Sequence, residues 1–418
     1  MTANCGICGV ASEFSIRRSG CERAIAGGHL FFVPLLGGRI TMNLDLTEEQ
    51  QLLQKTARDF FEKEFPKSLV RQMEEDPAGY SPDIWKKMAE LGWLGLVIPE
   101  EYGGAGLGFM DLIILMEEMG RGCLMGPYFS TVVLGALPIL AAGSDGQKAE
   151  FLPRIARGDL ILALALTEAS ATYEPSGIAA GAVRKGDTYI INGTKLFVHD
   201  AHIADYLITA VRTKIWSRPE EGISLFLVPA KSPGITITPL QTIATDKQNE
   251  VAFENVAVPA TNLLGPLDGG WPIIDRLLDQ AAIAKCAEMN GGCDWAVEAS
   301  VAYAKERVQY GHPIGAYGPI QHYLADMWAF SGMAKRLTYY AAWTVDQGLP
   351  CKAEVAKAKA WVNETYKHCT RMAVQIHGGI GTTLDHDIGL YYRRARQAAL
   401  LFGDTEYSYR KVAREMGL

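Results

Sequence analysis

Two glycine-rich stretches near the C-terminus combine residue types that can hold a bulky ligand and move a proton. Gly378-Gly379-Ile380-Gly381 lies between two helical patterns, and Gly403-Asp404-Thr405 follows the second pattern. Because glycine has no side chain, its backbone can approach a ligand closely, and a helix that starts beside such a corner offers unpaired N–H groups to an anion. Asp404 could act as a base where a pocket excludes water from its carboxylate. The alternative for the first stretch is an ordinary loop.

The composition indicates a globular protein with a large core. The chain has 418 residues, enough for two or three domains, and 48% of them are hydrophobic. The net charge of −7 and the sequence pI of about 5.7 argue against a nucleic-acid-binding surface. No apolar run reaches the roughly 18 residues that a membrane-spanning helix needs. We therefore predict neither nucleic-acid binding nor a membrane span.

The eight cysteines are scattered along the chain, and only Cys5 and Cys8 have C-x-x-C spacing. No second Cys or His pair follows at zinc-finger distance, so we predict no metal site. A low cysteine density in a chain of this length is typical of a reducing compartment, and the predicted location is the cytoplasm.

Residues 1–41 differ from the rest of the chain. They are rich in Gly, Cys, Ser and Arg and have no clear period, so we predict a non-structural leader, with Met42 as the alternative start. Residues 42–157 then predict an N-terminal helical domain. Its first helix opens with Thr47 and Gln50, which have the spacing of a capping box. Further helical patterns cover residues 81–91, 109–120, 130–142 and 147–156.

The pattern changes to strands in residues 158–268, which predict a small β-barrel-like domain. Asn192-Gly193 separates two strand-like runs and predicts a hairpin with a type I′ turn, because that turn needs positive φ at both positions. The other strand-like runs are residues 160–166, 206–211, 223–228, 235–239 and 250–258.

Helical periodicity returns in residues 269–418. Long patterns over residues 273–307, 320–347, 352–377 and 388–401 have short links and predict an up-and-down four-helix bundle. The predicted fold is therefore mainly α, with an N-terminal helical domain, a central β domain and a C-terminal bundle.

This domain order and several local motifs resemble the acyl-CoA dehydrogenase family of flavoproteins over roughly residues 43–418. The resemblance implies FAD as cofactor, an acyl-CoA thioester as substrate and an electron-transfer flavoprotein as electron acceptor. It also implies that a carboxylate removes the proton α to the thioester while hydride leaves the β carbon for flavin N5. The motifs that carry the resemblance are residues 98–108, 165–168, 189–195, 307–314, 321–327 and 375–381.

The resemblance assigns cofactor contacts to residues in three parts of the chain. In the β domain, Leu166 and Thr167 would line the flavin edge, and Phe197 and His199 would lie over the ring. In the bundle, Arg307 and Tyr310 would reach the FAD of a neighbouring subunit. The remaining contacts would lie near the adenosine-pyrophosphate part and are Gln375, Gly378, Gly379 and Thr405.

Each of these assignments has a plainer alternative. Thr167 could simply end a strand. Arg307 could be a helix-surface charge. Gln375 could be an amide buried inside the bundle.

The chain departs from the family pattern at the base. Gly403 stands where many members have a catalytic Glu, which makes Asp404, one residue later, the leading candidate. In isovaleryl-type members the base lies on the first bundle helix, where this chain has Ala281. The weaker candidates are Asp275 and Asp279 on that helix and Glu117 or Glu118 at the predicted pocket floor; the chain could also have no base.

A second departure lies in the substrate loop. Tyr173 occupies the place of a Ser that often contacts the pantetheine in the family, so we assign Tyr173 to substrate binding and expect an unusual acyl group.

Three functions follow from these patterns. The first is an FAD-dependent acyl-CoA dehydrogenase of lipid or acid catabolism, assembled as a homodimer or homotetramer. The second is a non-oxidising or base-less family member that acts as a partner subunit or as another acyl-CoA flavoprotein, which Gly403 favours. The third is a helical scaffold without a cofactor, which a colourless pure protein would favour.

Overall fold

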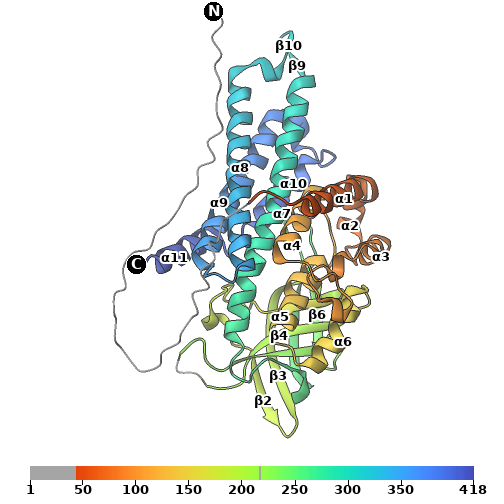
Figure 1. Cartoon of the computed structure of the whole chain (residues 1–418), viewed down its shortest axis with the longest axis vertical. Coiled ribbons are helices and arrows are strands. Elements are labelled where there is room, and N and C mark those ends of the chain that lie inside the picture. Colours follow the sequence, from red (N-terminus) through yellow and green to blue (C-terminus); the bar gives the residue numbers. More distant parts are fainter. Residues whose placement is uncertain (1–43, 216–217) are drawn as a thin grey trace, which may run out of the picture. The chain divides into compact units, whose positions relative to one another are not determined.

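The computed structural model describes residues 44–215 and 218–418. The predictions for the leader at residues 1–41, for Met42 and for the Cys5 and Cys8 pair lie outside the described residues. Within them, a helical N-terminal region, a central sheet and a long helical C-terminal region follow one another along the chain (Figure 1).

The N-terminal region begins with the predicted capping box. The Thr47 hydroxyl accepts the backbone N–H of Gln50 at 3.2 Å, and the Gln50 side chain accepts the backbone N–H of Thr47 at 3.1 Å. These bonds satisfy two N–H groups that a helix start leaves unpaired, and the prediction is confirmed. The helices of this region are α1 (Glu48–Glu64), α2 (Lys67–Glu75), α3 (Pro82–Glu90), η1 (Trp93–Gly95), η2 (Glu100–Tyr102), α4 (Phe109–Gly122), the π-helical η3 (Phe129–Ala136), α5 (Leu137–Ala142) and α6 (Asp145–Ala156).

The central region is one sheet with the strand order β6-β7-β3-β2-β4-β5-β8, and β1 joins it by pairing in parallel with β4. All four residues of β1 are buried, which anchors the segment that follows them. The strands are β1 (Leu162–Ala165), β2 (Gly181–Lys185), β3 (Thr188–His199), β4 (Tyr206–Arg212), β5 (Ile223–Pro229), β6 (Ile235–Leu240), β7 (Gln248–Pro259) and β8 (Leu263–Leu264), with short helices η4 (Pro175–Gly177), η5 (Ala201–Ile203) and η6 (Ala260–Asn262).

The predicted hairpin turn at Asn192-Gly193 is wrong. Both residues lie inside β3, where Gly193 pairs with Phe253 of β7, and the β2–β3 turn lies instead at Gly186, which has φ of +62°. A side chain at position 193 would place its Cβ 2.5 Å from the Cβ of Ala180. The glycine therefore permits a close approach between two segments and does not form a turn.

The four predicted bundle helices are confirmed as α7 (Trp271–Glu306), α8 (Gly318–Asp346), α9 (Lys352–His377) and α10 (Ile388–Ala398). A further helix, α11 (Thr405–Glu415), was not predicted, and it packs against α9. Figure 1 shows the hairpin of β9 (Val308–Gln309) and β10 (His312–Pro313) at the end of the bundle away from the sheet. The remaining short helices are η7 (Ile314–Ala316) and η8 (Gly378–Thr382).

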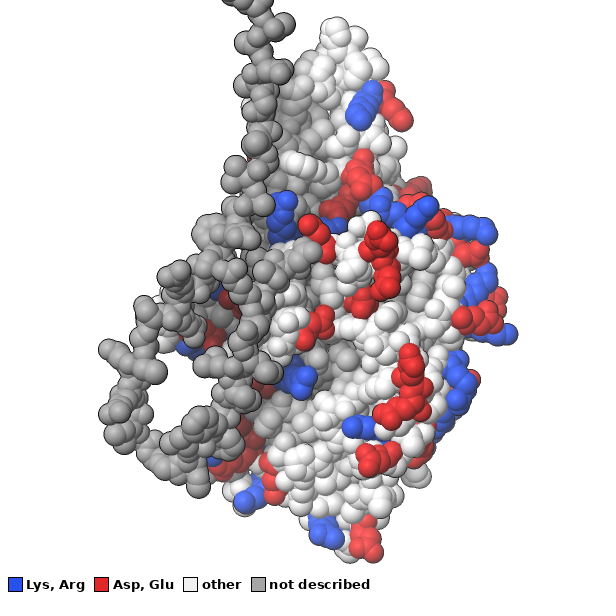
Figure 2. All heavy atoms as spheres, in the orientation of Figure 1, with Lys and Arg blue, Asp and Glu red and all other residues white. Residues whose placement is uncertain are grey.

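The charged side chains stand in mixed groups on the face drawn in Figure 2, where basic residues alternate with acidic ones and no broad basic patch is visible. Within residues 44–215 and 218–418, no helix combines the length and the apolar character that crossing a membrane would require. The same residues include no group of three or more His, Cys, Asp or Glu side chains placed to hold a metal ion.

Candidate functional site

The segment after β1 is held against β3 by a buried charge and a backbone bond. The backbone N–H of Leu196 donates to the carbonyl of Thr167 at 2.8 Å. The ammonium of Lys195, which is fully buried, donates to the carbonyl of Leu166 at 3.1 Å and to the carboxylate of Glu168 at 2.6 Å. A buried Lys in such a network fixes the backbone that it touches. Leu166 and Thr167 are therefore placed firmly beside the end of β3.

The end of β3 presents an aromatic ring and an imidazole. Phe197 has φ of +57° at a bulge in the β3–β7 pairing, and 45% of its surface is exposed. A left-handed conformation is unfavourable for a bulky residue, and such strain gathers at functional sites. His199 follows two residues later, with its Nε2 3.2 Å from the amide of Gln248 and 3.6 Å from Asp246. Burial lowers the pKa of His199, so the ring is neutral at pH 7.

Beside His199, a cavity of about 100 Å³ lies where the three regions of the chain meet. Its walls include Asp200 from the sheet region, Phe129 from η3 and Lys285 from α7. The Asp200 carboxylate accepts a hydrogen bond from the Ser130 hydroxyl at 2.6 Å, and burial raises the pKa of Asp200 to about 7. A carboxylate with a pKa near the working pH has the property that a general base requires.

Sequence reasoning missed Asp200. The available signal in the sequence was a carboxylate directly after His199. The structure adds that this residue follows the end of β3 and has a left-handed φ of +55°.

The corner before α11 contradicts one premise of the sequence prediction. Asp404 is exposed, and its carboxylate accepts the backbone N–H of Tyr407 at 2.7 Å as the N-cap of α11. The sequence made Asp404 a base only where a pocket excludes water from it, and here the carboxylate caps a helix at the surface, so the assignment of Asp404 as the base stays a prediction. Gly403 is buried with φ of +113°, and a Cβ there would lie 2.8 Å from the Tyr407 ring.

Aromatic rings fill the space next to this corner. Phe402 stacks on Phe129 with ring centroids 5.2 Å apart, and Tyr173 packs against Phe402 at 5.9 Å. The cavity that they leave beside Lys359 has a volume of about 10 Å³, room for at most one water molecule. Burial raises the pKa of Tyr173 to about 12, so its hydroxyl keeps its proton. Tyr173 narrows the space in which we predicted substrate contacts.

The other candidate carboxylates are each held by a cation. The ion pair does not lower the basicity of all of them, because burial raises the pKa of Glu117 to about 7 and raises the pKa of Asp279 above its ordinary value. The pairs are Glu117 with Lys335, Glu118 with Arg58, Asp275 with Lys352 and Asp279 with Lys411.

Five of the remaining predicted cofactor residues lie at the end of the bundle away from the sheet. Tyr303 of α7 stacks on His377 of α9 with centroids 4.3 Å apart, which holds the ends of the two helices together. Beside this contact lie Arg307 and Tyr310, both exposed, and the exposed residues Gln375, Gly378 and Gly379. The alternative that Gln375 is a buried amide is therefore wrong. Thr405 lies apart from them and donates its hydroxyl to Glu364 at 2.6 Å.

Models of one protein family match almost all of the described chain. The N-terminal, middle and C-terminal domains of acyl-CoA dehydrogenases match residues 47–159, 163–256 and 268–417. The chain belongs to the acyl-CoA dehydrogenase family. It is accordingly an FAD-dependent oxidoreductase that acts on a CH–CH bond of acyl-CoA thioesters.

Individual members agree with this placement. A probable acyl-CoA dehydrogenase of Bacillus subtilis, YngJ, is 34% identical over 90% of this chain and 100% of its own length. CarC, a subunit of the caffeyl-CoA reductase-Etf complex of Acetobacterium woodii, is 31% identical over 86% of this chain and 96% of its own. The structure of butyryl-CoA dehydrogenase from Megasphaera elsdenii aligns with a TM-score of 0.84 and 29% identity, covering 90% of this chain and 100% of the other.

The residues of this acyl-CoA dehydrogenase fit an FAD. The exposed ring of Phe197 and the neutral His199 offer an apolar and hydrogen-bonding face for a flat ring. At the far end of the bundle, a Cβ added at Gly378 or Gly379 would meet no atom within 4 Å, so their backbone is open to a ligand. Arg307 forms no ion pair within residues 44–215 and 218–418 and can serve a pyrophosphate.

The two groups of residues lie far apart in one chain. Lys285, near the middle of α7, lines the cavity beside His199, whereas Arg307 directly follows the C-terminal end of that helix. At 1.5 Å per residue, the helix between them is roughly 30 Å long.

Proposed function

We propose that this protein catalyses the α,β-dehydrogenation of an acyl-CoA thioester and passes the electrons to an electron-transfer flavoprotein. The observation that carries the proposal is the cavity at the meeting point of the three regions, which His199 and Asp200 line and which follows the half-exposed Phe197 along the chain. The Etf partner is proposed because one relative is a subunit of an Etf complex. We place the enzyme in the cytoplasm and in lipid or acid catabolism.

FAD, when bound, accepts the hydride that leaves the β carbon of the substrate. Leu166 and Thr167 would line its flavin edge, and Phe197 and His199 would lie against its ring. Because His199 is neutral, the imidazole can donate or accept a hydrogen bond without adding a charge. The aromatic packing of Phe402 keeps water away from the neighbouring space.

The distance between the two groups of cofactor residues supports an oligomer. A single FAD would need Arg307, Tyr310, Gln375, Gly378 and Gly379 from a second copy of the chain, because roughly 30 Å of helix separates them from the β-domain face. We therefore propose a homodimer, or a homotetramer built from dimers, in which Thr405 closes each site.

A carboxylate must remove the proton α to the thioester, and we weigh two leading candidates for it. Asp404 would have to leave its helix cap and turn inward to do so. Asp200 needs no such rearrangement, because it already faces the cavity with a pKa of about 7. We propose Asp200 as the competitor of Asp404 for this role.

The second candidate function is that of a partner subunit without a base of its own. The specific observation is Gly403: a side chain there meets Tyr407, and only about 10 Å³ remains beside it. In this case the chain binds FAD or acyl-CoA but does not oxidise the thioester alone.

One experiment separates these functions. The full-length protein with FAD bound is titrated under anaerobic conditions with straight-chain, branched, dicarboxylic and alicyclic acyl-CoA thioesters. Loss of the visible flavin band with one of them supports the dehydrogenase and names its substrate class. The titration is repeated with Asp404→Asn and with Asp200→Asn. The base is the residue whose substitution abolishes the loss of the flavin band. A bound flavin that no thioester reduces would favour the partner subunit.

A further inference from the structure

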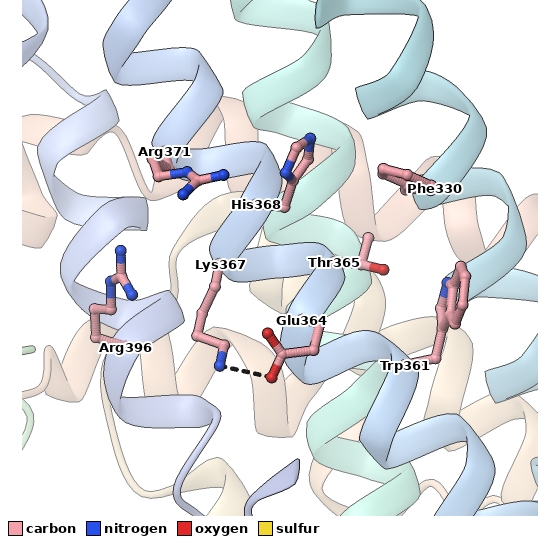
Figure 3. A pocket seen from close by; sticks show the side chains of 8 residues that line it. All are labelled: Phe330, Trp361, Glu364, Thr365, Lys367, His368, Arg371 and Arg396. Carbon is pink, nitrogen blue, oxygen red and sulfur yellow. Dashed lines mark hydrogen bonds and ion pairs between the residues drawn. The ribbon is translucent and has the colours of Figure 1, made fainter.

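A cavity of about 330 Å³ on the bundle belongs to the proposed cofactor position (Figure 3). Its lining residue Glu364 accepts the hydroxyl of Thr405 at 2.6 Å, and Thr405 is the residue that we propose closes the FAD site. The substrate must enter elsewhere, at the cavity of about 100 Å³ beside His199.

The cavity beside His199 contains charged side chains that the proposed reaction does not use. Besides His199 and Asp200, its lining includes Lys285 and Glu288 of α7 and Arg394 of α10. Hydride transfer requires the β carbon of the substrate to lie against the flavin at His199, so the acyl group must enter this cavity. The part of the acyl group beyond the β carbon therefore has to match these charges.

Lys285 holds its ammonium inside the protein. The residue is 6% exposed, and its ammonium lies 4.2 Å from the centre of the Phe129 ring and donates to the carboxylate of Glu288 at 2.6 Å. An ammonium carries three donors, and Lys285 makes no second hydrogen bond within residues 44–215 and 218–418. It can therefore donate to a group that enters the cavity.

Arg394 has more unused donors. Its guanidinium donates to the backbone carbonyl of Leu124 at 3.0 Å and forms no ion pair with any described residue. A guanidinium has five N–H donors. Four buried side-chain atoms in the described part of the chain lack a hydrogen-bond partner, and none of them belongs to Arg394. Its unpaired N–H groups are therefore not enclosed by protein and are available to a ligand in the cavity.

The carboxylates of the cavity are already engaged. Glu288 accepts Lys285, and Asp200 accepts the hydroxyl of Ser130. Asp246 accepts hydrogen bonds from three side chains, which are those of Thr242, Gln248 and Gln397. The wall thus has donors in excess. A plain alkyl end would displace water from Lys285 and Arg394 without replacing its hydrogen bonds, which costs free energy.

The rest of the lining suits a short hydrocarbon chain. Leu124, Met125, Phe129 and Leu401 supply apolar surface. The volume of about 100 Å³ is below the roughly 300 Å³ at which sites for drug-sized ligands begin. This limits the acyl group to a few carbons beyond the reacting ones.

We propose that the acyl group of the substrate is short and ends in an oxygen acceptor, a carboxylate or carbonyl oxygen, which Lys285 and Arg394 bind. The inference rests on the proposed function, which supplies the acyl-CoA thioester, and it adds the chemistry of the acyl end. Lys285 and Arg394 then determine substrate specificity. A carboxylate also offsets the charge of Arg394, which has no carboxylate partner within the described residues.

The test compares three thioesters that differ only at the end of the acyl group. Hexanoyl-CoA ends in a methyl group, 5-oxohexanoyl-CoA adds a carbonyl oxygen, and glutaryl-CoA ends in a carboxylate. Calorimetric titration of the FAD-loaded full-length protein, with its flavin reduced beforehand so that no thioester is oxidised, measures each dissociation constant. We expect both oxygen-bearing thioesters to bind about tenfold more tightly than hexanoyl-CoA, because each accepts a hydrogen bond from a cation.

Substitutions then assign the preference to the two residues. Lys285→Met and Arg394→Gln should each lower the preference for the oxygen-bearing thioesters by about tenfold without weakening hexanoyl-CoA. Lys285→Arg keeps the charge and should keep most of the preference. Lys55→Met, at an exposed position of α1, is the control and should change no dissociation constant. If Arg394→Gln does not fold, the two Lys285 variants still decide.

The outcomes separate this inference from the proposed function. Equal affinity for the three thioesters, or an unchanged preference in Lys285→Met, overturns the inference even if hexanoyl-CoA reduces the oxidised flavin. A preference that is lost in Lys285→Met supports the inference even if no thioester reduces the flavin, and then only the proposed dehydrogenation fails. Absence of binding by all three thioesters overturns both. A preference for glutaryl-CoA alone identifies the acceptor as a carboxylate, and an equal preference for 5-oxohexanoyl-CoA identifies it as a carbonyl oxygen.

Discussion

The carboxylate of Asp404 accepts the backbone N–H of Tyr407 at 2.7 Å, and this bond starts α11. The bond gives Asp404 a structural role that any test of its chemical role must keep intact. Asn and Asp are equally good N-caps, whereas Ala is a poor one. The pair of substitutions Asp404→Asn and Asp404→Ala therefore separates capping from catalysis.

We expect Asp404→Ala to lower the free energy of unfolding by about 1 kcal/mol and Asp404→Asn to leave it nearly unchanged. Urea unfolding followed by circular dichroism measures both values. If Asp404 is the base, both variants lose anaerobic flavin reduction by acyl-CoA. If Asp404 only caps α11, Asp404→Asn reduces its flavin at the parent rate, and that result would remove Asp404 from the mechanism.

The carboxylate of Asp200 makes stability depend on pH. Burial raises its pKa from 3.8 to about 7, so between these values the folded chain holds a proton that the unfolded chain has lost. The contribution of Asp200 to stability therefore falls as the pH rises from about 4 to 7. Asp200→Asn keeps an acceptor for Ser130 and removes the titration. We expect its melting temperature to exceed that of the parent by an amount that grows between pH 5 and pH 8.

Parallel melting profiles of Asp200→Asn and the parent would contradict this assignment. If Asp200 is also the base, the rate of flavin reduction in the parent should rise with pH through about 7. The Asn variant should then show almost no reduction at any pH, although it is at least as stable.

Features fixed by neighbouring residues were predictable, and features fixed by distant contacts were not. The capping box of Thr47 and Gln50 involves only residues three apart, and the sequence identified it. Gly193 was assigned to a turn because its real constraint, the approach of Ala180, comes from another segment. Asp404 was considered only as a base, and its role as the N-cap of α11 was not recognised. The signal existed, since Asp404 directly precedes a helical pattern.

The buried Lys195 can be used to test whether this side chain positions the segment of Leu166 and Thr167 for cofactor binding. Its ammonium bonds Leu166 and Glu168 inside the protein. Lys195→Met removes one partner of a buried ion pair, which typically costs about 3–5 kcal/mol. We expect reduced stability in urea and a lower flavin content after purification. Lys185→Met, at an exposed position of β2, is the control and should change neither. A stable Lys195→Met protein with full flavin content would disprove the positioning role.

The distance between the two groups of cofactor residues predicts complementation between damaged chains. Arg307→Ala should lose FAD because the contacts at the bundle end are damaged. Phe197→Ala should lose FAD because the contacts at the β-domain face are damaged. When the two variants are co-expressed with different tags, a mixed dimer has one site with both groups intact, so about half of the flavin should return. Co-expression of Arg307→Ala with Gln375→Ala should recover nothing, because both changes damage the same group. Flavin absorbance per protomer of the doubly tagged species measures the result. Equal recovery in both pairs, or full flavin content in Arg307→Ala alone, would show that each chain holds its FAD without a neighbour.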